Sequence, residues 1–170
     1  MSSVDNDGRF APPRAAVDDV PEAVDGLVLA TRGSRFGATL IDVLIAFALI
    51  GLAALLTPWN PMANAGQSLW SFQFANTALG FLLFVAVHGY LLHTRGQTLG
   101  KRIVGIRIVR PDGSAASFAR LVGVRYGLLS LLNVSPAVGQ LFGLADSLCI
   151  FRASRRCLHD DIADTLVIKA

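Results

Sequence analysis

The sequence predicts an all-α membrane protein with two spanning helices and a C-terminal helical hairpin, about four membrane helices in all, together with a short cytoplasmic β-hairpin. Of its 170 residues, 53% are hydrophobic and only 16% are charged, which is too apolar for a water-soluble fold of this length. Two apolar runs, 38–56 and 72–92, are each long enough to cross a bilayer, because about 18 apolar residues suffice.

Basic side chains flank these two runs on one side only. Arg32 and Arg35 precede the first run, and five lysines and arginines lie between positions 95 and 110, whereas the loop 57–71 between the runs carries no charge. Cytoplasmic segments are the ones enriched in Lys and Arg. We therefore expect a multi-pass protein of the bacterial cytoplasmic (inner) membrane, with both termini in the cytoplasm and the loop outside.

The third apolar region, 118–151, is too long for one span and is interrupted by Asn133 and Pro136. Because both of its ends are basic, a single crossing would leave one basic cluster outside. A hairpin avoids this, with helices at about 117–133 and 137–152 and a turn at Asn133–Pro136. Each arm spans only about 24 Å. A fully crossing hairpin and a tilted or re-entrant one therefore both remain open.

Two short segments between and after these helices favour strands. The segment 105–114 (GIRIVRPDGS) alternates apolar and basic residues before a Pro-Asp-Gly turn, and Thr165–Lys169 has the same strand character. Both are expected on the cytoplasmic side, where they can pair. Residues 1–31 are acidic and proline-containing, which predicts a disordered tail without a signal peptide. The transmembrane domain is then 32–170.

Charged residues within the apolar regions are the candidate functional residues. Asp42 lies inside the first run, where a carboxylate costs a few kcal/mol unless it faces protein or water. Arg35 shares its helix face but lies about 10 Å along the axis. We therefore expect Asp42 to pair with Arg120 or Arg125. Such a carboxylate either binds a cation or proton or forms a buried ion pair that fixes helix packing. Asp146 is a second carboxylate in an apolar segment.

No motif indicates a cofactor, a metal or nucleic acid as a partner. Gly96–Arg102 has three residues between its glycines and Arg102 after the lysine, so it is not a Walker loop; a tight basic turn at lipid phosphate level is expected. His88 and His93 are five residues apart and do not share a helix face. Cys149 and Cys157 match no zinc or haem spacing, and we expect reduced thiols.

His159 and Asp160 are expected to form a cytoplasmic cap or hydrogen-bonded strut. No nucleophile, base and oxyanion donors converge, so an enzyme is not expected, and one acting on lipid is the weakest hypothesis.

Four short motifs occur in order along most of the chain. Arg35 to Asp42 reads R-x-x-A-x-x-I-D, residues 96–105 read G-x-T-x-G-K-R-x-x-G, and an arginine follows at Arg120 or Arg125. Leu158 to Val167 reads L-H-D-x-x-A-x-T-x-V. This pattern resembles the RDD family of small bacterial membrane proteins over 35–168. Its loop motif falls on Gly96, Thr98, Gly100 and Lys101. One departure is Asp164, where the family often has glycine.

The resemblance implies a multi-helix inner-membrane domain and no settled activity, with transport of some unidentified ligand as the usual suggestion. Our first hypothesis is transport of an ion or small ligand with Asp42 as the titrating group. Because so small a domain encloses little volume, this favours a homo-oligomer. The alternative is a non-enzymatic membrane scaffold or partner-binding subunit whose Arg and Asp residues fix packing. The expected partner in either case is the lipid bilayer, and the ligand is unknown.

Overall fold

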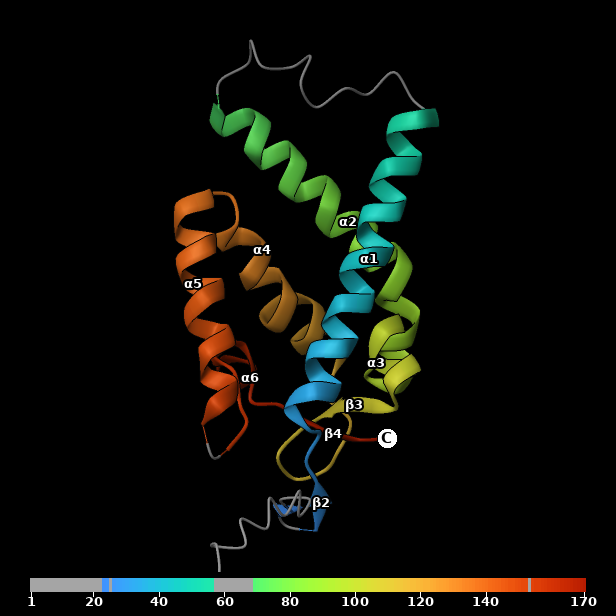
Figure 1. Cartoon of the computed structure of the whole chain (residues 1–170), viewed down its shortest axis with the longest axis vertical. Helices are drawn as coiled ribbons and strands as arrows, with labels where there is room; N and C mark the ends of the chain where they lie inside the picture. Colours follow the sequence, from blue (N-terminus) through green and yellow to red (C-terminus); the bar gives the residue numbers. More distant parts are fainter. Residues whose placement is uncertain (1–22, 25, 57–68, 153) are drawn as a thin grey trace, which may run out of the picture.

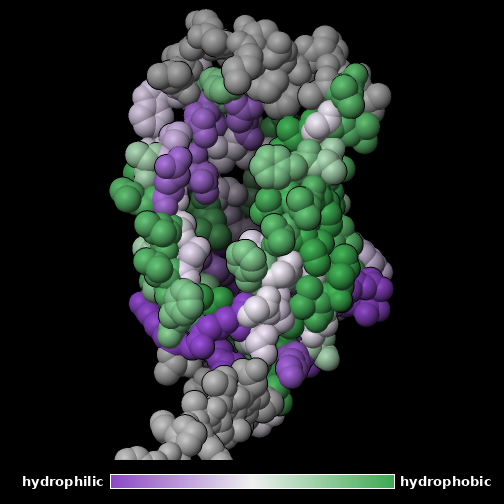
Figure 2. Space-filling view, viewed as in Figure 1, coloured by the Kyte–Doolittle hydropathy of each residue, from purple (hydrophilic) through white to green (hydrophobic). Residues whose placement is uncertain are grey.

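Two long helices dominate the computed structural model, which describes residues 23–24, 26–56, 69–152 and 154–170. Helix α1 (Arg32–Leu56) and helix α2 (Leu69–Arg95) contain the two predicted apolar runs and begin or end several residues beyond them. By length and composition both can cross a membrane. Only 11% and 22% of their apolar windows are buried, unlike the core helix of a soluble protein. Figure 2 shows hydrophobic side chains covering the α1 side of the molecule.

A helical hairpin follows, as predicted. Its first arm joins a π-helical segment, η2 (Arg120–Gly127), to α4 (Leu128–Leu132). Its second arm is α5 (Pro136–Leu148), which starts with proline in its first turn and ends in the 3₁₀ segment η3 (Cys149–Phe151). In Figure 1 both arms stop short of the upper ends of α1 and α2. Four membrane-crossing helices are therefore not confirmed; among the described helices, only α1 and α2 have spanning length.

The two predicted strands pair, although not as a hairpin. Strand β3 (Ile106–Val109) runs antiparallel to β4 (Leu166–Lys169), with Ile106 opposite Lys169. The strands are far apart in sequence, because the whole helical hairpin lies between them. The predicted Pro-Asp-Gly turn forms after β3, where the Gly113 amide donates to the Arg110 carbonyl at 2.9 Å.

The prediction that residues 1–31 form a disordered tail is wrong for the last residues of that range. Strands β1 (Ala23–Val24) and β2 (Leu27–Val28) form an antiparallel pair. Leu29 then bridges to Ile168, and the Ala30 amide donates to the Val167 carbonyl at 2.9 Å. The packed domain therefore begins before residue 32. Residues 1–22 and 25 lie outside the described part of the chain.

The best-packed core lies at the lower end of the molecule in Figure 1, where the start of α1, the end of α2 and the β3–β4 sheet meet. It contains Leu92, Ile106, Ile108, Leu121 and Val167. Two short helices complete this end, α3 (Leu99–Val104) against α1 and α6 (Leu158–Ile162) against η2. A band of hydrophilic side chains crosses the same end in Figure 2. The upper parts of α1 and α2 diverge from this base.

Candidate functional site: a polar-ended pocket between the long helices

The loop motif at Gly96–Lys101 builds a turn that packs tightly on its neighbours. Gly96 has φ of +64°, and a Cβ there would lie 2.5 Å from the Ile108 carbonyl oxygen. Thr98 caps α3 by accepting a hydrogen bond from the Lys101 amide at 3.3 Å. A Cβ on Gly100 would lie 2.1 Å from the Ala38 carbonyl oxygen. Gly100 therefore lets α3 lie directly against α1, and Gly96 lets the turn before α3 lie against β3.

Asp42 is the residue of α1 that fastens this loop. Its Oδ2 accepts a hydrogen bond from the Thr98 hydroxyl at 2.6 Å, and its Oδ1 accepts one from the Gly100 amide at 2.7 Å. The expected pairing of Asp42 with Arg120 or Arg125 is wrong; neither arginine reaches it in the described structure. A hydroxyl and a backbone amide provide the donors instead.

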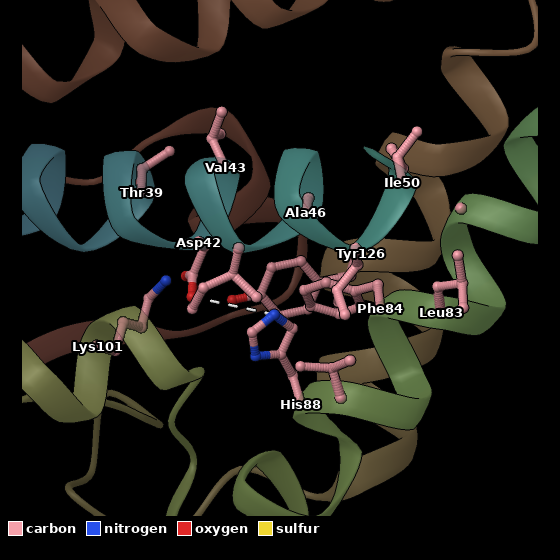
Figure 3. Close-up of a pocket in the computed structure, with 14 residues that line it drawn as sticks. Thr39, Asp42, Val43, Ala46, Ile50, Leu83, Phe84, His88, Lys101 and Tyr126 are labelled. Carbon is pink, nitrogen blue, oxygen red and sulfur yellow. Dashed lines mark ion pairs between the residues drawn. The ribbon is translucent and has the colours of Figure 1, made fainter. Parts of the chain in front are cut away.

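Asp42, His88 and Lys101 together form the polar end of a pocket between α1 and α2 (Figure 3). The pocket has a volume of about 320 Å³. Its other walls are mainly apolar and come from Val43, Ile45, Ala46, Leu49, Ile50, Leu83, Phe84 and Val87. The backbone amide of Leu99 donates to His88 Nδ1 at 3.2 Å, and His88 Nε2 lies 4.0 Å from Asp42 Oδ1. The pocket therefore has one polar end on an apolar crevice.

Lys101 is the cation of this pocket. Its side chain is 9% exposed, and its ammonium lies 6.0 Å from the centre of the Tyr126 ring. Within the described residues it makes no ion pair. The centre of the Tyr126 ring also lies 5.8 Å from the Arg125 guanidinium, so the ring is close to two cations.

A second group, here called the Asp160 cluster, comprises Arg35, Arg125 and Asp160. Asp160 is fully buried and pairs with both guanidiniums, and its Oδ2 accepts the Cys157 amide at 3.0 Å. Arg125 also donates to the Thr165 hydroxyl. Burial alone would raise the pKa of Asp160, but Arg125 and Arg35 hold that pKa well below its usual range. The cluster thus joins α1, η2 and α6 around one carboxylate.

His159 extends this cluster to Asp146. His159 Nδ1 lies 2.6 Å from Asp146 Oδ2, and its Nε2 lies 3.1 Å from the Arg125 guanidinium. Because a guanidinium can only donate, Nε2 accepts and Nδ1 carries the hydrogen. Burial and Arg125 lower the pKa of His159, which agrees with a neutral ring. Asp146 therefore orients His159 and lies close to α6.

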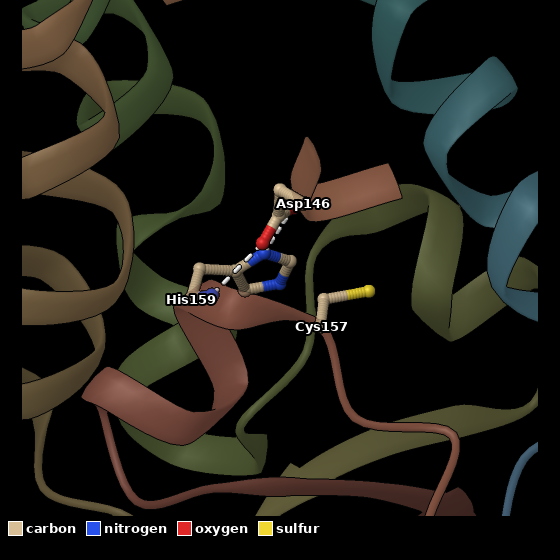
Figure 4. A group of neighbouring side chains, drawn as sticks. All are labelled: Asp146, Cys157 and His159. Atoms are coloured by element: carbon tan, nitrogen blue, oxygen red, sulfur yellow. Dashed lines mark hydrogen bonds and ion pairs between the residues drawn. The ribbon is translucent and has the colours of Figure 1, made fainter. Parts of the chain in front are cut away.

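The grouping of Asp146, Cys157 and His159 raises the question of a metal site (Figure 4). Both ring nitrogens of His159 already have partners, and Arg125 opposes a cation beside it. Burial raises the pKa of the Cys157 thiol to about 11, so thiolate is scarce. These residues suit a structural role better than metal ligation.

Arg120 belongs to neither group. It donates to the Ala163 carbonyl at 3.1 Å and lies 3.5 Å from Asp164. Asp164 has φ of +49°, the left-handed conformation that glycine adopts most readily and that Asp tolerates better than most residues. The sequence departure at this position therefore keeps the turn.

The structure brings together Arg35, Arg125, Asp146, His159 and Asp160. Separately, it joins Asp42 to Thr98 and Gly100, with Lys101 lining the same pocket as Asp42. Sequence reasoning missed Tyr126 and Thr165, and it gave His88 no role beside Asp42. His88 shares one face of α2 with Phe81 and Phe84, and this spacing is the only sequence signal that places it near a pocket wall. The same spacing occurs in helices that simply pack in a core, so it does not identify a site.

Comparisons with known proteins identify the family of this chain. The sequence profile of the RDD family matches residues 29–164. A protein of Bacillus subtilis (strain 168), named "Uncharacterized protein YckC", is 32% identical over 145 residues, covering 80% of this chain and 82% of the relative. No solved structure matches. The profile covers the loop at Gly96–Lys101, Asp42 and the Asp160 cluster, and the chain belongs to the RDD family.

Proposed function

We propose that the protein is a multi-pass protein of the bacterial cytoplasmic membrane that transports a small ligand by way of the pocket between α1 and α2. Family membership and two helices of spanning length support the membrane location. The basic flanks of both helices favour cytoplasmic termini. Cysteine labelling in a background without Cys149 and Cys157 tests this orientation, with position 64 reactive from outside and position 154 from inside.

One observation carries the ligand proposal. Asp42, His88 and Lys101 converge at one end of a cavity that is otherwise mainly apolar and lies between the two long helices. Ionisable groups within spanning segments are costly and mark ligand or ion pathways. An apolar cavity with a few converging polar groups is also the usual form of a small-molecule site.

The structure changes the role that we assign to Asp42. Both of its oxygens already accept hydrogen bonds, from Thr98 and Gly100. We therefore assign Asp42 to positioning the α3 loop, which places Lys101 in the pocket. Coupling to a proton or cation through Asp42 would act on a carboxylate that already accepts two hydrogen bonds.

Native mass spectrometry of the protein released from mild detergent tests whether the pocket holds a ligand. Wild-type protein should carry a bound small molecule. Ala46→Trp, which fills the pocket wall, should lose it, whereas Leu44→Trp should keep it, because Leu44 is exposed and does not line the pocket. A folded wild-type protein without any bound molecule would contradict the proposal.

A membrane scaffold is the second candidate function, and the Asp160 cluster favours it. Arg35 and Arg125 both pair with Asp160 inside the protein, as charges with a purely structural role would. A scaffold predicts that Asp42→Asn acts by lowering the amount of folded protein. A transporter predicts that folded Asp42→Asn protein is recovered with altered ligand binding. A homo-oligomer is compatible with either function. The mass of the protein measured in detergent tests the oligomeric state.

A further inference from the structure

We propose that the ligand of the α1–α2 pocket is an amphiphile with an oxyanion head, a carboxylate or phosphate monoester on a single hydrocarbon chain. This inference rests on the ligand site proposed above and assigns the chemistry of its occupant. It follows from which polar groups in the pocket already have partners and which do not.

The carboxylate in the pocket, that of Asp42, already accepts two hydrogen bonds. Asp42 accepts the Thr98 hydroxyl at 2.6 Å and the Gly100 amide at 2.7 Å, one on each oxygen. The close approach of Gly100 to α1 holds these donors in place. A ligand cation would share this carboxylate with two short hydrogen bonds, and it would do so beside the Lys101 ammonium, which repels it.

Among the described residues the cation of the pocket has no acceptor, and the Tyr126 hydroxyl, which is also buried without a partner, can donate as well as accept. Lys101 carries three N–H donors, is nine-tenths buried, and has neither a hydrogen bond from its ammonium nor an ion pair within the described residues. His88 accepts the Leu99 amide on Nδ1, so in its neutral form Nε2 carries a hydrogen. An ammonium in a mainly apolar pocket is costly without an acceptor. An oxyanion at this end of the pocket would provide the acceptor that Lys101 lacks.

The rest of the pocket suits a hydrocarbon chain. Ile45, Leu49 and Leu83 line it, and the wall residues Val43 and Ile50 are also 42% and 44% exposed, so the crevice reaches the outer surface of α1. A chain can therefore enter sideways from the bilayer. The volume of 320 Å³ is at the lower end of the range for ligand pockets, about 300–1,000 Å³, and so favours one chain over a two-chain lipid.

Probe binding to the full-length wild-type protein in a nonionic detergent tests the assignment. The probes are dodecyl phosphate, dodecanoate, dodecyltrimethylammonium and inorganic phosphate, measured by equilibrium dialysis near neutral pH. We expect saturable binding of the two anionic amphiphiles and at least about tenfold weaker binding of the cationic one, as expected when one charge-assisted contact is lost. Inorganic phosphate should not compete at equal concentration.

Three variants locate the binding. Lys101→Met should weaken dodecyl phosphate binding at least about tenfold, while Lys101→Arg keeps the charge and should retain it. Arg102→Met is the matched control, because Arg102 is the exposed neighbour on the same helix. The wild-type comparison of anionic and cationic probes stands even where Lys101→Met fails to fold.

Distinct outcomes would overturn this inference and the proposed function. Preferred binding of dodecyltrimethylammonium, lost in Ala46→Trp, would overturn the oxyanion assignment and leave the pocket as the ligand site. Equal binding of inorganic phosphate and dodecyl phosphate would overturn the amphiphile. Unchanged anion binding in folded Lys101→Met would remove Lys101 from the site. Absence of binding by every probe to wild type would overturn the inference, and a wild type that also carries no copurified molecule would overturn the proposed function as well.

Discussion

Replacing Asp160 with asparagine should destabilise the protein far more than the same change at the next residue. Asp160 is fully buried and pairs with two buried guanidiniums, those of Arg35 and Arg125. Asp160→Asn removes the charge and leaves both cations inside the fold. Removing one partner of a buried ion pair costs about 3–5 kcal/mol, so we expect a loss in unfolding free energy of at least that order.

Asp161 provides the matched control. It also pairs with two arginines, Arg152 at 3.1 Å and Arg156 at 2.9 Å, but its side chain is 40% exposed. Exposed pairs contribute about 0–1 kcal/mol, so Asp161→Asn should be nearly neutral. Reversible unfolding by dodecyl sulfate in mixed micelles, followed by circular dichroism, measures both variants. Equal free energies of unfolding for the two variants would refute the assignment of Asp160 as the hub of the cluster.

Three further predictions concern the lower end of the molecule. Gly100→Ala should lower the unfolding free energy by about 1–3 kcal/mol or more, because the added methyl group overpacks against Ala38. Gly51→Ala, which meets no neighbouring atom, should be neutral or stabilising. The same unfolding assay compares the two variants. The folded protein lowers the pKa of His159 below its ordinary value of 6.5. The neutral ring therefore contributes to the unfolding free energy above pH 6.5, and this contribution is lost as the pH falls from there through the lower pKa of the folded state. Wild-type stability should therefore fall more between pH values of about 7.5 and 5.5 than that of His159→Gln, and an identical slope in the two proteins would contradict this. Cys157, with a pKa of about 11, should resist iodoacetamide at mildly alkaline pH until the protein is unfolded; rapid labelling in a folded Cys149→Ser variant would show that it is not buried.

The elements that the sequence predicts well are those with a local signal. The apolar runs at 38–56 and 72–92 and the break at Asn133–Pro136 located α1, α2 and the hairpin, because hydrophobic length and a proline act within a few residues. The strand at Ile106–Val109 was found through its alternation and the turn that follows it. The start of the packed domain was misplaced, because Leu29 and Ala30 are ordered by pairing with β4, far away in sequence.

The site was only partly predictable for the same reason. Asp42 stands out in the sequence by its place in an apolar run, but its partners Thr98 and Gly100 carry no opposite charge that would identify them. A hydroxyl and a backbone amide stabilise a carboxylate without any charge pattern in the sequence. Asp160 was expected to serve as a cap, and it does accept the Cys157 amide. Its burial between two arginines depends on the packing of three elements, which no local pattern reveals.

Transport by reconstituted protein tests the central claim, that the pocket between α1 and α2 is the working site. The molecule that copurifies with wild type would be radiolabelled and its uptake into proteoliposomes measured, with proton and sodium fluxes recorded in parallel. We predict saturable uptake by wild type and by Leu44→Trp and uptake no greater than that of empty liposomes by Ala46→Trp. Wild-type protein that is folded and correctly oriented, yet transports neither that molecule nor protons nor sodium, would contradict the account and favour a membrane scaffold.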